Sequence, residues 1–475
     1  MPGSLSFEFS FQSAQQQAIS EELPLHILLL DNFSGHRDRK PLGERHSVAV
    51  DIDNFDQVIA RHAPQLDLDL SGTVIHLEIR SLEDFHPDSL FRSVPLFASL
   101  RAQIKKDLSE KTPAVKHDAV AISPENPFQA LLGGTARSED KQGIAQSKHF
   151  DAMIKKIVDP HLVLASSSEP IGLSALQDGA CGLLMRAILQ HPDFKALEAA
   201  WRGVHFLLTQ SELDQEVRLF LLDASKAELA ADCRKHQAQL EQSASFALLA
   251  ERWQHATNPV PCSLLVGAYQ FDASEADLHL LAAMGAIARH VNAPWLSSAA
   301  SAILGCASYQ QQPEPRDWSV DVDQQARWKA LCNSEQAPWL GLVMQNMLLR
   351  LPYGATTDPI ESFKFEEIDQ QPLAEQLLWG CGALAATTLI AQSFLEDGWD
   401  MQLGSLLEIP QLPAYTYRAD GEVVMQSCAE SALLERAAEA AIASGLMPLQ
   451  GFRNKNSVRL LNFQSLARTK LAGRF

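Results

Sequence analysis

A few pairs of acidic and histidine side chains have the spacing that acid–base or metal chemistry requires. His36 with Asp38 and His149 with Asp151 could each pair an imidazole with a carboxylate. Asp51 and Asp53 would share one side of an extended strand, where two carboxylates can bind a cation. We favour surface positions for the histidine pairs, and a strand end followed by a helix cap for the aspartates.

Glu366 and Glu367 form a further acidic pair, which the sequence predicts to be solvated. The longer motifs of catalysis and phosphate binding, GxxxxGK[ST], GxGxxG, GxSxG and HExxH, do not occur. The eight tryptophans are dispersed along the chain, so we expect buried anchors rather than a ligand cage. We therefore predict no cofactor, no metal and a non-enzymatic role. An enzyme site assembled from distant residues is the alternative of a different class.

Composition limits the class of protein further. The chain has 475 residues, 46% of them apolar and 20% charged, which is typical of a globular protein with more than one domain. Its net charge of −19 disfavours nucleic-acid binding. Seven cysteines without a CxxC pair predict reduced thiols and a cytoplasmic location. The N-terminus lacks the features of a secretory signal, and no apolar run approaches the ~18 residues that span a membrane.

The clearest interaction element is at the N-terminus. Leu5, Phe7, Phe9 and Phe11 alternate with polar residues, which is the period of a strand with one apolar face. Such a strand must join a sheet, either in its own domain or, by β-augmentation, in a neighbouring chain. The pattern leaves both open. Residues 12–21, which include three consecutive glutamines, would serve as the tether that strand donation needs.

Residues 1–110 predict a small α/β unit, of which 1–20 are the strand and its tether. Continuous or alternating apolar residues indicate the strands, and an Asp or Asn cap with an apolar face indicates the helix. The predicted elements are strands at 23–30, 47–52 and 74–79 and a helix at 53–62.

Residues 111–148 have little apolar periodicity and are rich in proline, glycine and charged residues, so we assign them as a linker. Within them, the apolar patch 127–132 could be a short helical docking element. Residues 149–475 predict a larger α/β unit, in whose core we expect Phe194, Leu197 and Trp201, which follow helical spacing. Its other predicted elements are strands at 217–222 and 263–267 and helices at 278–291 and 379–394.

The last 25 residues contain six basic residues and no Asp or Glu. This basic strip is either a solvated tail or a docking surface for an acidic partner, whose affinity should then fall with salt. Its members are Arg453, Lys455, Arg459, Arg468, Lys470 and Arg474.

Several motifs in order resemble the two subunits of the type VI secretion contractile sheath. The N-terminal motifs EELPLHILLLDNFSG, RKPLGERHSVAVDIDNFDQVIARHAPQL and LEIRSLEDFHPDSLFRSVPLFASL resemble the small subunit, TssB. The later motifs HPDFKALEAAWRGVHFLL, LLVGAYQFD, APWLSSAAS, RWKAL, LLRLPYGATTDPIESFKFEE and LLWGCGAL resemble the large subunit, TssC. The common order of many motifs makes this resemblance specific.

The resemblance implies a fused sheath protomer. In this family the two subunits form a heterodimer, and the dimers polymerise around an inner tube through exchanged β-strands; the strand at residues 5–11 fits that role. The expected partners are other sheath subunits, with baseplate or membrane-complex proteins as further candidates. An AAA+ unfoldase recycles the contracted sheath.

Two departures from the family pattern affect these expectations. The TssC-like part is shorter than the family's large subunit, and the linker stands where that subunit carries its unfoldase-recognition helix. Contacts with the inner tube and the unfoldase are therefore left open. A sub-stoichiometric sheath cap, or a baseplate or membrane-complex adaptor, is the alternative to a bulk sheath subunit.

Overall fold

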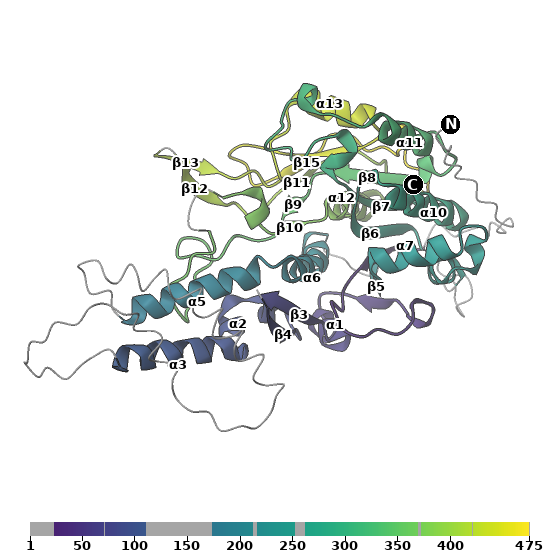
Figure 1. Ribbon diagram of the computed structural model, residues 1–475. Helices are drawn as coiled ribbons and strands as arrows, with labels where there is room; N and C mark the ends of the chain where they lie inside the picture. The colour runs from purple at the N-terminus through teal and green to yellow at the C-terminus, as the bar shows by residue number, and fades with distance from the viewer. Residues whose placement is uncertain are drawn as a thin grey trace, which may run out of the picture.

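A nine-stranded sheet forms the centre of the computed structural model (Figure 1). Six neighbouring strands, from β14 to β5, run parallel, and the antiparallel strands β15 and β2 border them. The described residues are 23–70, 72–110, 173–211, 216–251, 262–368, 372–419 and 421–474. In spatial order the strands are β11 (Glu408–Ile409), β15 (Val458–Leu460), β14 (Met447–Gly451), β8 (Leu340–Met344), β7 (Trp295–Ala299), β6 (Leu264–Phe271), β1 (Leu25–Asp31), β5 (Val217–Asp223) and β2 (Val48–Val50).

Strand β1 lies between β5 and β6 and runs parallel to both. Its nearly continuous apolar sequence, LHILLLD, suits a strand that is covered on both faces. Leu25, Ile27 and Leu29 point into one helix layer, whereas Leu28 and Leu30 point into the other. The N-terminal part of the chain therefore contributes a central strand to a sheet that the later part completes.

Helices cover both faces of the sheet, which confirms the predicted α/β class. One layer shares a core with the alternate residues of β1, and the second layer packs on the opposite face. The first layer contains α1 (Phe55–His62), α6 (Pro192–Gln210) and α12 (Gly382–Asp397). The second contains α7 (Lys226–Lys235), α8 (Ala244–Phe246), α10 (Glu275–Val291), α11 (Val322–Cys332) and α13 (Glu435–Ala443).

An arm of two helices, α3 (Pro95–Glu110) and α5 (Leu173–Leu189), extends from this body (Figure 1). Helix α2 (Pro87–Ser93) leads into α3, which packs along α5. The Gln177 side-chain amide donates a hydrogen bond to the Arg101 carbonyl over 3.2 Å. Three two-stranded sheets complete the fold: β3 (Gln65–Leu70) with β4 (Thr73–Glu78), β9 (Met347–Leu348) with β10 (Trp379–Gly380), and β12 (Thr416–Ala419) with β13 (Glu422–Met425).

Most of the predicted elements that fall on described residues are confirmed, with shifted ends. The helix predicted at 379–394 is wrong at its start, because residues 379–380 form β10 and the helix begins at Gly382. The strand predicted at residues 5–11 and the linker lie outside the described residues. The boundaries of the two predicted units remain predictions.

Candidate functional site

The N-terminal part of the chain, before residue 111, and the later part, from residue 173 on, meet at a joint. This joint is built around Trp201 of α6. This side chain is fully buried, and its ring centroid lies 5.2 Å from that of Phe33, 5.4 Å from that of His62 and 6.2 Å from that of Phe55. Its indole nitrogen donates a hydrogen bond to the Phe33 carbonyl over 3.1 Å. Trp201 thus holds the end of β1 and the start of α1 against α6.

The other two residues expected in the core of the larger unit lie on the same helix. Phe194 is fully buried and packs edge-on against Phe85, with ring centroids 5.6 Å apart, and Leu197 is also buried. Phe33, Phe55 and Phe85 all come from the N-terminal part of the chain. The apolar face of α6 therefore covers the joint between the two parts as well as the sheet.

Asp88 of α2 makes a polar contact across the same joint. Its carboxylate accepts backbone hydrogen bonds from Glu361 over 3.0 Å and from Ser362 over 2.9 Å. Burial alone would raise the pKa of Asp88, but these hydrogen bonds outweigh burial and lower the pKa. The carboxylate thereby fixes the loop of residues 349–368 against the N-terminal part of the chain.

A buried ion cluster lies beneath this loop. The Arg350 guanidinium contacts Glu198 over 2.7 Å on one side and Glu367 over 2.7 Å on the other. Glu198 is fully buried, Glu367 is 3% exposed and Arg350 is 8% exposed. The prediction that Glu366 and Glu367 form a solvated pair is therefore wrong for Glu367, because Arg350 supplies the charge that allows its burial.

Two more side chains complete the cluster. Arg202 donates to Glu198 over 2.7 Å and to the Tyr353 hydroxyl over 3.0 Å, and Arg350 stacks over the Tyr353 ring at 4.3 Å. Burial opposes ionisation of Glu198, but Arg350 and Arg202 outweigh burial and hold its pKa below the usual value. Burial raises the pKa of Tyr353. Glu198 therefore stays ionised, and the cluster ties α6 to the loop.

Sequence reasoning missed this cluster, although a signal was present. Glu198 follows Phe194 by four residues and precedes Trp201 by three, so it lies on the apolar face of its helix. Arg350 likewise interrupts an apolar run, LLRL. A charge at a position expected to be buried indicates a buried partner of opposite charge.

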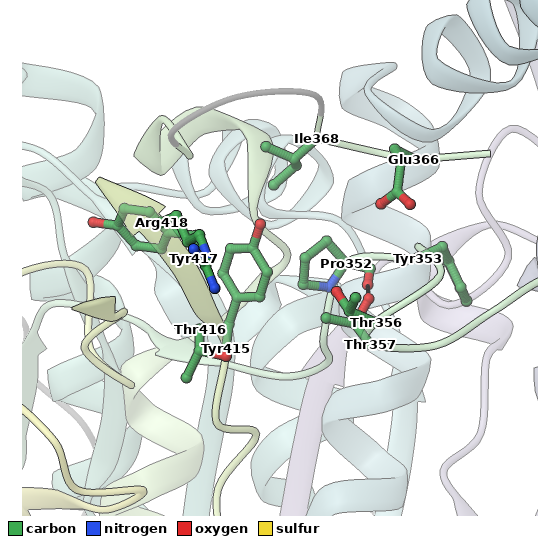
Figure 2. Close-up of a pocket in the computed structure, with 10 residues that line it drawn as sticks. All are labelled: Pro352, Tyr353, Thr356, Thr357, Glu366, Ile368, Tyr415, Thr416, Tyr417 and Arg418. Carbon is green, nitrogen blue, oxygen red and sulfur yellow. Dashed lines mark hydrogen bonds between the residues drawn. The ribbon is translucent and has the colours of Figure 1, made fainter. Parts of the chain in front are cut away.

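A recess of about 280 Å³ opens between this loop and strand β12 (Figure 2). Tyr415 and Tyr417 form one wall, with ring centroids 5.9 Å apart, and Glu366 lies on the loop side. The Glu366 carboxylate accepts the backbone N–H of Ala355 over 3.0 Å, so it shapes the loop. Tyrosine and threonine hydroxyls with Arg418 give the recess the chemistry to receive a polar side chain.

The remaining acidic and histidine pairs lie at the surface or outside the described residues. His36 is exposed and its Nε2 lies 3.5 Å from Asp193 rather than pairing with Asp38. Asp51 is exposed, and its carboxylate accepts the backbone N–H of Asn54 over 2.8 Å, just before α1 begins. His149 and Asp151 lie outside the described residues.

The basic strip is distributed over several elements. Arg453 and Lys455 are exposed in the turn between β14 and β15, and Arg459 is exposed on β15. Lys470 is exposed as well. Arg468 is exposed near the end of α13, and the half-buried Arg474 stacks over Trp399 at 3.6 Å. Five of the six side chains are thus accessible from solvent.

The seven cysteines are free thiols, and six of them are buried. Burial raises the pKa of Cys262 to about 12 and that of the half-buried Cys381 to about 11, which disfavours the reactive thiolate. Of the tryptophans in the described ranges, three are buried and four are half-buried, while Trp253 falls outside those ranges.

Among the described residues, no group of three or more His, Cys, Asp or Glu side chains could hold a metal ion. None of the described helices combines the length and the apolar composition needed to cross a bilayer.

Comparison with known proteins gives a family for this architecture. The family described as VipB, the EvpB tail sheath N-terminal domain, matches residues 177–467. This chain belongs to that tail sheath family. The type VI secretion system VipA family matches residues 5–118, so the two family matches follow one another along one chain. The resemblance to a TssB-like segment fused to a TssC-like segment is confirmed.

A relative of this VipB-family chain is the type VI secretion system sheath protein TssC1 of Pseudomonas aeruginosa. It is 35% identical over 286 residues, which cover 59% of this chain and 57% of the relative. The chain thus spans little more than half the length of this relative. Both sheath-family matches meet at the joint, because β1 and Phe33 lie in the VipA match and α6 lies in the VipB match.

Proposed function

We propose that this protein is a structural component of a type VI secretion contractile sheath and assembles with other sheath subunits in the cytoplasm. The observation that carries the proposal is the position of β1, a strand of the VipA match, between β5 and β6, which are strands of the VipB match. A fused chain with this topology is a preassembled protomer. Its role is to supply packing surface, with no cofactor and no reaction of its own.

Strand addition is the proposed mode of assembly. The apolar face of Leu5, Phe7, Phe9 and Phe11 would fill pockets on a neighbouring subunit, while the backbone of the strand extends that subunit's sheet. The VipA match includes these residues, which supports the proposal. We expect deletion of residues 1–12 to abolish incorporation into sheath assemblies, measured by co-sedimentation with the ordinary sheath subunits.

A matched variant tests the apolar face itself. Replacing Phe7 and Phe9 with Ser removes that face and should reproduce the deletion, whereas Ser6→Thr and Ser10→Thr on the polar face should co-sediment normally. Circular dichroism checks that each protein remains folded. Normal incorporation of the deletion variant would eliminate strand donation.

The alternative function is a sheath cap or an adaptor to a baseplate or membrane-complex protein. The solvent accessibility of Arg453, Lys455, Arg459, Arg468 and Lys470 favours it. Replacing these five residues with Gln should weaken capture of an acidic partner and remove the salt dependence of that capture. Replacing the exposed Arg61 and Arg316 with Gln is the charge control. If capture of the partner changes neither with salt nor with the substitutions, the adaptor function is excluded.

Electron microscopy separates the two roles. Long tubes formed by the purified chain, alone or with ordinary sheath subunits, would support a bulk sheath subunit. Decoration confined to tube ends would support the cap or adaptor. Contacts with an inner tube and with an AAA+ unfoldase belong to the same proposal and can be tested by adding each component to these assemblies.

A further inference from the structure

A groove of about 730 Å³ runs between α5 and the loop of residues 355–366. This volume falls within the roughly 300–1,000 Å³ of clefts that bind small molecules. Phe363 and Phe365 line its loop side, and α5 lines the other side with Gly179 and Gly182. The two glycines leave the helix without side chains at these positions, which widens the groove.

The floor of the groove is apolar and well supported. Phe365 is 6% exposed, and the Arg186 guanidinium lies 5.9 Å from its ring centroid. Phe363 is half-buried, and its ring centroid lies 5.0 Å from that of Phe91. Arg186 is held in place because it also donates to the Glu366 carbonyl over 2.8 Å. The groove therefore has a preformed apolar floor, and its lining also includes the charged residues Asp178, Glu361 and Lys364.

The path of the chain indicates what fills it. Helix α3 ends at Glu110 and α5 begins at Leu173, so residues 111–172 leave and re-enter the fold at the arm that carries the groove. The groove residues of α5, from Asp178 to Arg186, lie within roughly 20 Å of Leu173 along the helix. Pro127 follows Glu110 by 17 residues, which can extend over roughly 55 Å.

We propose that residues 127–132 of the same chain dock in this groove. Their sequence, PFQALL, is the apolar patch of the linker. Phe128, Leu131 and Leu132 have the i, i+3, i+4 spacing of one helix face, which is how short amphipathic helices fill grooves. Asn126 before Pro127, and Gly133 after Leu132, are typical of helix ends. This inference is independent of the proposed sheath role.

A disulfide trap tests the docking in the full chain. The native thiols are not expected to compete, because burial raises the pKa of Cys181, Cys262 and the others. Leu131→Cys combined with Ser362→Cys, a substitution at an exposed groove residue, should form an intramolecular disulfide under mild oxidation. Ser138→Cys with Ser362→Cys is the matched control, since it lies in the same linker outside the patch. We expect the first pair to react at least tenfold faster.

Two substitutions in the linker identify the contact. Phe128→Asp should reduce the rate of the Leu131–Ser362 cysteine pair to that of the control, whereas Gln129→Asp should leave it unchanged. Neither substitution touches the described fold, so loss of folding does not complicate the comparison. Equal rates for the two pairs would overturn the proposal. A disulfide-linked dimer as the main product would also overturn it and would assign the groove to a second copy.

Discussion

At the scale of single residues, Arg350 is the cation at the centre of the buried ion cluster. It lies between two buried carboxylates, Glu198 and Glu367. Removing one partner of a buried ion pair leaves an uncompensated charge and typically costs about 3–5 kcal/mol. We therefore expect Arg350→Met to lower the free energy of unfolding by about that amount, measured by urea denaturation. The exposed Arg316→Met is the control and should change it little.

Arg350→Met should also reverse the way in which stability changes as the pH falls. In the native protein the pKa of Glu198 is lowered, so its contribution to stability is present above its unfolded pKa of about 4.3 and is lost as the pH falls through the folded pKa. In Arg350→Met, Glu198 keeps Arg202 but loses Arg350, the larger of the two influences that oppose burial, so the pKa of Glu198 should rise. The variant should then gain stability as the pH falls from 7 towards 5, seen as a rising Tm. A parallel pH response in both proteins would contradict this account.

The pKa of Asp31 is shifted in the opposite direction to that of Glu198. Asp31 lies at the end of β1 opposite Asp223. Burial raises the pKa of Asp31 to about 7. The negative charge of Asp223 adds to this rise, whereas the hydrogen bond from the Asn32 backbone opposes it. The native state thus favours the protonated acid, and the cost of ionisation grows from pH ~4 to pH ~7. We expect Asp31→Asn to raise the Tm at pH 8 and to change it little at pH 4. The exposed Asp38→Asn is the control.

At the scale of elements, α6 joins the two family segments through Trp201. Truncating a fully buried aromatic side chain typically costs about 3–5 kcal/mol, part of it from the cavity that remains. Trp201→Ala should therefore destabilise the protein by about that amount and increase amide exchange in β1 and α1, whose end and start it contacts through Phe33 and Phe55. Trp318→Ala, at a half-buried position away from β1 and α1, is the matched control. Unchanged exchange in α1 would show that the joint does not depend on this ring.

Local sequence patterns predicted which segments form helices and strands better than they predicted which of these lie side by side. The apolar run of β1 and the stripe of α6 are strong signals, because burial on two faces or on one helical face leaves a distinct period. The alternation in QLDLDL equally marks β3, which the sequence analysis did not identify. In contrast, no local pattern places β1 between β5 and β6. The burial of Glu367 likewise depends on Arg350, which lies at the other end of the same loop and also contacts Glu198 of α6.

At the scale of the whole molecule, the linker joins two parts that share one sheet. Strands β5 and β6 are separated by β1, so each makes its backbone ladder with a strand from the N-terminal part. Without β1, two long apolar edges would face one another across an open gap, and such edges aggregate. We expect this pairing to form without the covalent connection between the parts, because β1 is held by contacts with the sheet and with α6.

A split chain tests this interdependence. Cutting the chain after Gly134, within the linker, and expressing both pieces together should yield a complex that co-elutes in gel filtration and unfolds in one transition. The larger piece, residues 135–475, should aggregate when expressed alone, because it lacks β1 and the partners of Trp201. Adding back residues 1–134 with Leu28→Asp, which places a charge in the fully buried face of β1, should fail to rescue it. A larger piece that is monomeric and folds cooperatively by itself would show that the two segments are separate domains, and that β1 adds to a sheet already formed.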